Sequence, residues 1–219
     1  FKEQAGQNSS SRFGLKGTED LGDGWKVGFN LENSFKSDTG ALEEKGSRLF
    51  HREALLFVQS PYGELSMGRT GALDAGTGRY NLMGSGATAM GTGLDMIGKS
   101  TKILLGTGDR MDNTVTYQSP SFAGLTVYAQ ASLKKESVYA EKPDTIKEAT
   151  HPEGSSDADR YYALGATFSA DGLNAGLVVS MNDYSCTELE KDYDDGYPVS
   201  GFVNYDFGMV KPMLAAQYW

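Results

Sequence analysis

The residues able to do covalent or metal chemistry are few in this chain. It holds two histidines, His51 and His151, and one cysteine, Cys186, which cannot form an internal disulfide. The sequence has no Gly-x-Ser-x-Gly elbow, no phosphate-binding loop and no His-Glu-x-x-His metal motif. We therefore interpret the histidines as surface residues and Cys186 as a loop residue, and expect no enzyme, no cofactor and no metal site.

Charged side chains that alternate with apolar ones are more informative. In residues 11–18, Phe13 and Leu15 share one face of an extended strand, while Arg12 and Lys16 take the other. By the same alternation Arg52 opposes Leu55 and Phe57. A charge that faces mid-bilayer lipid costs ~2–4 kcal/mol, so this parity decides which residues a membrane strand can carry outward.

A fourth basic residue, Arg110, opposes Met111 and Tyr117 in the same way. The parity therefore predicts that all four basic residues face away from the apolar side of a sheet. Solvated charges on a soluble sheet would show the same pattern.

The alternation recurs in ten segments, which predicts ten antiparallel strands in an all-β fold with no amphipathic helix among them. The apolar faces of these segments begin at Phe13, Trp25, Leu55, Leu65, Met111, Leu125, Tyr162, Leu173, Val199 and Val210.

The connections between these segments alternate strictly between short and long. Short turns such as Asp20–Gly24 and Ser60–Gly63 are separated by long polar segments, at about 36–47, 70–109, 135–158 and 185–196. This asymmetry is typical of outer-membrane β-barrels, which have short periplasmic turns and long outer loops. The first strand then runs down and the last runs up, so we expect a barrel that lacks strands at both ends.

Composition excludes one class of protein and argues against another. Hydrophobic residues make up 39% of the chain, and no apolar run approaches the ~20 residues of a spanning helix, which excludes a helical membrane protein. A net charge of −9 argues against nucleic acid as a partner.

Three blocks carry a family resemblance, namely "SRFGLKGTEDLGDGWKVGFNLE", "RLFHREALLFVQSPYGELSMGR" and "NTVTYQSPSFAGLTVYAQAS". In this order they resemble the general trimeric porins of the Gram-negative outer membrane, especially the betaproteobacterial type. The resemblance implies one porin domain over residues 1–219, supplying about strands 2 to 11 of a barrel of about 16 strands. It also implies a homotrimer in contact with outer-membrane lipid and lipopolysaccharide, and a channel for ions and small hydrophilic solutes.

The same resemblance assigns residues 70–109 to an inward-folded constriction loop. This segment contains ten glycines but lacks the Pro-Glu-Phe-Gly-Gly signature of many relatives. Its candidate acids are Asp74, Asp95 and Asp109, and the basic wall opposite would be Arg12, Lys16, Arg52 and Arg110. Charges within 70–109 sum to zero, so the added wall residues predict a net positive constriction and a weak preference for anions.

Residues 188–195 are strongly acidic, which indicates a solvated loop or a divalent-ion bridge to lipopolysaccharide. Two alternatives to a channel remain open. A soluble or surface-displayed binding module, such as an adhesin, would also be all-β. A barrel enzyme would need a nucleophile and base that the sequence does not nominate.

Overall fold

The computed structural model describes residues 10–42, 48–75, 77–87, 110–135, 160–183 and 196–218. Ten strands and one short helix lie in these ranges, and the strands form a single sheet. The elements are β1 (Ser11–Gly22), β2 (Trp25–Phe35), β3 (Glu53–Ser60), β4 (Gly63–Gly71), α1 (Leu82–Ala87), β5 (Arg110–Gln118), β6 (Leu125–Ser132), β7 (Arg160–Ala170), β8 (Leu173–Asp183), β9 (Val199–Tyr205) and β10 (Met213–Tyr218).

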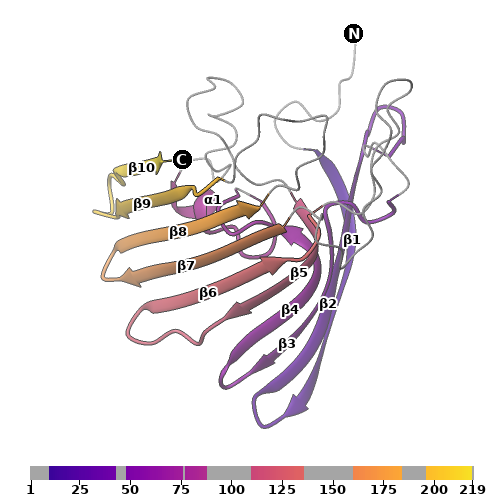
Figure 1. The fold of residues 1–219 in the computed structure, drawn as a ribbon, viewed down its shortest axis with the longest axis horizontal. Helices are drawn as coiled ribbons and strands as arrows, with labels where there is room; N and C mark the ends of the chain where they lie inside the picture. Colours follow the sequence, from indigo (N-terminus) through magenta and orange to yellow (C-terminus); the bar gives the residue numbers. More distant parts are fainter. Residues whose placement is uncertain are drawn as a thin grey trace.

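Each strand pairs with the next one along the chain, and every pairing is antiparallel. The result is a curved sheet with β1 and β10 at its two edges, and it is not closed (Figure 1). The all-β antiparallel prediction with ten strands is confirmed. The last strand starts later than expected, because Val210 accepts a hydrogen bond from the amide of Phe207 and belongs to the turn.

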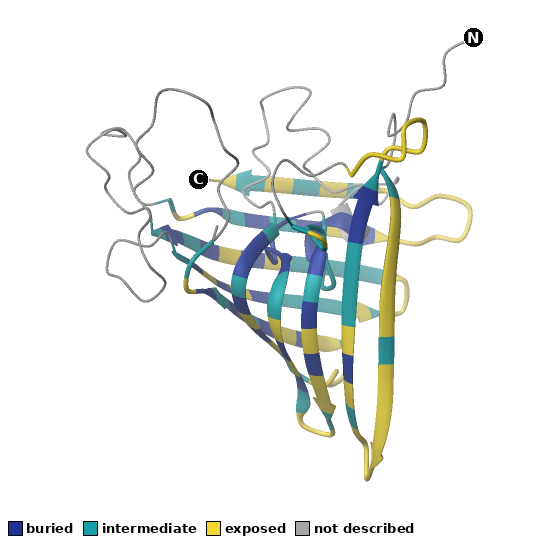
Figure 2. Ribbon diagram, turned by 90° about the vertical axis from the view of Figure 1, so that its right-hand side faces the viewer, coloured by how far each residue is buried: buried dark blue, intermediate teal, exposed yellow. Residues whose placement is uncertain are grey.

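The two faces of the sheet differ in chemistry. Burial alternates along the strands (Figure 2), and on one face large apolar side chains are exposed. The opposite face, called the inner face here, carries buried polar side chains such as Ser66, Thr116, Gln130, Ser180 and Ser200. Representative residues of the apolar outer face are Leu15, Phe29, Leu56, Met67, Val115, Val127, Leu164, Leu177, Val203 and Leu214.

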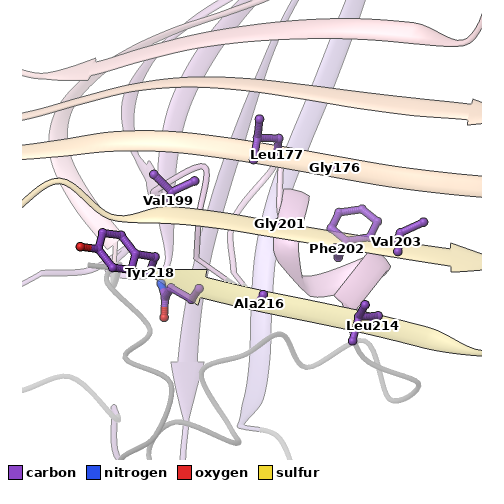
Figure 3. Close-up of a pocket in the computed structure, with 10 residues that line it drawn as sticks. Gly176, Leu177, Val199, Gly201, Phe202, Val203, Leu214, Ala216 and Tyr218 are labelled. Carbon is purple, nitrogen blue, oxygen red and sulfur yellow. The ribbon is translucent and has the colours of Figure 1, made fainter.

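Small residues make a hollow of about 440 Å³ where β8, β9 and β10 meet. Gly201 and Ala216 lie at its centre, and Val203, Leu214 and Tyr218 lie around them (Figure 3). The hollow continues the apolar character of the outer face.

The expected orientation of β3 is wrong. Leu56 and Val58 are exposed at 64% and 39%, whereas Leu55 and Phe57 are buried on the inner face. The register decides this, because Leu56 pairs with outward-facing Phe29 of β2. Four consecutive apolar residues give both faces the same hydropathy, so alternation within this strand could not choose between them.

The parity expected for β5 is also wrong at its start. Tyr117 is 41% exposed on the outer face, but Met111 is 3% exposed and packs with the buried cluster of the inner face. Between them the pairing with β4 shifts register, and Asn113 adopts a positive φ of 51°. An extra residue in one strand reverses the faces beyond it, which is why Met111 and Tyr117 do not share one.

One element was not anticipated. The short helix α1 contacts β8, β9 and β10, and lies beside the sheet in Figure 1. Among the described residues, no helix has the length and apolar character needed to cross a membrane.

Candidate functional site

The segment that follows β4 folds back over the inner face of the sheet. Its first part, residues 71–78, closes on itself, because a Cβ on Gly71 would come within 2.1 Å of the carbonyl oxygen of Thr77. Gly78 closes the same contact with a φ of 89°, a conformation that favours glycine. We call residues 71–78 the inner loop; Gly76 lies outside the described residues.

Gln130 of β6 fastens the beginning of the inner loop. Its side-chain oxygen accepts a hydrogen bond from the amide of Leu73 at 3.0 Å, and its side-chain nitrogen donates to the carbonyl of Gly71 at 3.2 Å. The same nitrogen also donates to Thr116 on β5 at 2.9 Å. One amide side chain thus satisfies two backbone groups of the inner loop.

Asp74 fastens the loop to two further strands. Tyr161 of β7 donates its hydroxyl hydrogen to Oδ1 of Asp74, and Ser180 of β8 donates to Oδ2, each at 2.9 Å. Asp74, Tyr161 and Ser180 are all buried, with exposed fractions of 4%, 0% and 3%. The structure therefore places this candidate acid in contact with the wall of the sheet.

Arg79 and Tyr80 return the chain to β4. The Arg79 guanidinium makes two hydrogen bonds of 2.7 Å with the two carboxylate oxygens of Glu64 and lies 3.9 Å from the centre of the Phe57 ring. Tyr80 donates to Ser66 at 2.6 Å and lies 3.1 Å from Glu64. The bond to Glu64 raises the pKa of Arg79, and burial raises the pKa of Tyr80, which further favours the protonated form that each group already has at neutral pH.

An apolar cluster completes the attachment. It joins residues of the folded-back segment, residues 71–87, to inward-facing residues of five strands, and a Cβ on Gly165 of β7 would come within 2.8 Å of Leu82. The cluster consists of Ala72, Leu73, Ala75, Leu82, Met83, Met111, Tyr128, Tyr161, Ala163, Val178 and Phe202.

Two of the four basic candidates lie together on the inner face of β1. Arg12 pairs in register with Ser34, and Lys16 pairs with Asn30 on the same face of β2. Both basic residues are exposed. The structure thus places Arg12 and Lys16 on one face, as their alternation with Phe13 and Leu15 indicated.

The other two basic candidates are placed differently. Arg52 precedes β3 and forms an ion pair through its Nε with Glu32, which shares the inner face with Asn30. Arg52 is therefore held at the inner face by Glu32. Its expected alternation with outward-facing Leu55 and Phe57 was wrong, because those two residues lie on the inner face. Arg110 is the first residue of β5 and pairs with Gly71. Because the register shifts between Arg110 and Tyr117, alternation with Tyr117 cannot assign Arg110 to a face.

Sequence reasoning missed several charged residues of this region. Asp112 accepts hydrogen bonds from both Arg48 and Arg69, at 2.6 Å and 2.7 Å, and Glu53 contacts Thr70 at 2.8 Å. Alternation with outward-facing Leu65 would have assigned Glu64 to the inner face. No comparable signal was available for Asp112, because it lies within the shift in register.

The remaining acidic candidates, Asp95, Asp109 and residues 188–195, lie outside the described residues. Within the described ranges, no group of three or more His, Cys, Asp or Glu residues is arranged to hold a metal ion.

The whole chain is similar to known porins in sequence. A family model described as Gram-negative porin matches residues 1–219. An outer membrane porin protein of Bordetella pertussis is 32% identical over 215 residues, which cover 96% of this chain and 52% of that relative. Outer membrane porin protein 32 of Delftia acidovorans is 26% identical over 215 residues, covering 93% and 52%.

A solved structure described as an anion-selective porin from Comamonas acidovorans is similar in fold. Its TM-score is 0.62 at 24% sequence identity, and the match covers 95% of this chain and 57% of that one. This chain spans about half the length of the two curated relatives, 52% of each.

Proposed function

Because the chain belongs to the Gram-negative porin family, an outer-membrane family whose members are channels rather than enzymes, we propose that it forms part of the wall of a water-filled pore for passive diffusion. The solutes of this pore are ions and small hydrophilic molecules. The observation that carries the proposal is the contrast between the two faces of the sheet, apolar and exposed outside, polar and crossed by a folded-back segment inside.

The pore narrows where residues 70–109 enter it. Support comes from residues 71–87, whose described part lies against the inner face through Gln130, Asp74 and Arg79. We assign Arg12, Lys16, Arg52 and Arg110 to the wall of this constriction, and Asp74, Asp95 and Asp109 to the loop. Residues 1–219 form a single domain in this proposal.

A weak preference for anions follows from the charges. The wall acids Glu32 and Glu64 are each paired with an arginine, and Asp112 is held by two. Acids that are paired in this way do little to offset the positive charge of Lys16 in the pore. The solved relative from Comamonas acidovorans is described as anion-selective, which points in the same direction.

We expect Lys16→Gln to reduce the ratio of anion to cation permeability about twofold, since a unit charge about 8 Å away in water contributes about 0.5 kcal/mol with opposite sign for anions and cations, and salt at ~0.1 M roughly halves this energy. The measurement is the reversal potential of the channel in a planar bilayer under a salt gradient. Lys211→Gln, in the exposed turn before β10, is the matched control and should leave the ratio unchanged. If the permeability ratio is the same in both variants, the assignment of Lys16 to the pore wall is wrong.

The family also supports a homotrimer in contact with outer-membrane lipid and lipopolysaccharide. The exposed apolar side chains of the outer face are suited to contact lipid, and so is the largely apolar hollow between β8 and β10. Migration of the unheated protein in SDS gels tests the assembly: a band at three times the mass of the heated chain supports the trimer, and a single monomer band contradicts it.

A further inference from the structure

The position of Asp74 is unusual for an acid that would face ions in a pore. Its residue is 4% exposed, and both of its carboxylate oxygens accept hydrogen bonds from hydroxyl groups of the wall. A carboxylate whose oxygens are occupied in this way has little surface left for a passing ion. Its chemistry is directed at the strands instead.

The two donors come from different strands. Tyr161 belongs to β7 and Ser180 to β8, and they lie on the same face because Tyr161 pairs in register with Asn182 of β8. Asp74 therefore links β7 and β8 from the inner face of the sheet. Hydrogen bonds to a carboxylate are stronger than those between neutral groups, and losing a partner in a buried site leaves the full cost of its desolvation.

The bridge lies next to the attachment made by Gln130, which holds Gly71 and Leu73 on β6. Residues 71–74 are thereby held by three consecutive strands. The chain that follows runs to Arg79 and then to α1 on β9, so its distance from the wall depends on these contacts. Apolar packing adds affinity for the wall, but it is less directional than the hydrogen bonds.

We propose that Asp74 is a positioning residue of the constriction: its bonds to Tyr161 and Ser180 fix how far the folded-back segment stands from the wall. Asp74 thereby sets the conductance and steadiness of the open pore, whereas ion preference is set by exposed wall charges such as Lys16. This inference rests on the proposed pore.

Three variants of the natural full-length protein that contains residues 1–219 provide the test, in planar bilayers. Asp74→Asn keeps the shape but removes one acceptor and the charge, Tyr161→Phe removes one donor without changing any charge, and Ser180→Ala is a milder change at the same carboxylate. Tyr162→Phe is the matched control, since Tyr162 lies on the same strand with 39% of its surface exposed on the outer face. Folding of each variant is established first by its heat-dependent gel migration.

We expect Asp74→Asn and Tyr161→Phe to lower the single-channel conductance by roughly 1.5-fold and to increase current noise, because a released segment moves from the wall into the pore. Ser180→Ala should act in the same direction with a smaller effect. The reversal potential should stay at its original value in all three. The double variant of Asp74→Asn with Tyr161→Phe should change the conductance by less than the product of the two single changes, because both act on the same cluster of hydrogen bonds.

Two results would overturn the assignment. A shift of reversal potential in Asp74→Asn, with no change in Tyr161→Phe, would show that the carboxylate acts on ions directly. Unchanged conductance and noise in all folded variants would leave Asp74 with a role in stability alone. If the pore proposal itself is wrong, the result is different, because the unsubstituted full-length protein would then carry no current.

Discussion

Arg79→Ala is expected to lower the free energy of unfolding by about 3 kcal/mol, because it leaves a buried carboxylate without its partner. The side chain of Glu64 is 7% exposed and receives two hydrogen bonds of 2.7 Å from the guanidinium of Arg79. The stacking of Arg79 over Phe57, 3.9 Å from the ring centre, is lost as well. Urea unfolding of the protein in lipid vesicles measures the change.

Two further variants separate the causes of this loss. Arg79→Lys keeps the charge but cannot make the two-pronged bond, so it should recover only part of the stability. The double variant Arg79→Ala with Glu64→Gln removes the buried charge and should be more stable than Arg79→Ala alone. If the double variant is less stable than the single one, the stranded carboxylate is not the cause.

Leu164→Arg is the second large effect, with an expected loss of about 2–4 kcal/mol for a charge placed toward the middle of the lipid. Leu164 lies near the centre of β7 and is 66% exposed on the outer face. The expected loss depends on that face meeting lipid, since an arginine in water would cost little.

Thr167→Arg is the control for this prediction. Thr167 lies on the same strand but on the inner face, and it pairs in register with Gly176 of β8. Its arginine should reach the water of the pore, so unfolding in lipid vesicles should change much less than for Leu164→Arg. Equal losses in the two variants would mean that the faces of β7 are not divided between lipid and water.

Local alternation predicted the strands well because one-sided burial leaves a period of two in the sequence. For β1, β2, β4 and β6 to β10 the predicted apolar face is the exposed one. The prediction was wrong in β3, where Leu55 to Val58 are all apolar and the pairing with β2 alone decides the face. It was also wrong at Met111, since a shift in register depends on two strands and leaves no mark in one.

Residues 70–109 also show what the sequence could and could not predict. Their length and ten glycines indicated packing against other structure, but not which wall residues would hold the described part, residues 71–87. Gln130, Tyr161 and Ser180 come from strands 57 to 106 residues away in the chain from their partners. Such contacts are created by the sheet topology, so spacing within the sequence could not identify them.

The most direct test of the proposed pore is current through the natural full-length protein that contains residues 1–219, in a planar bilayer under a salt gradient. We expect stable conductance steps and a reversal potential that shows higher permeability to chloride than to the cation. Steps that favour cations would contradict the assignment of a net positive constriction. The absence of any step, from protein whose gel migration shows it to be folded, would contradict the pore itself and favour a binding module.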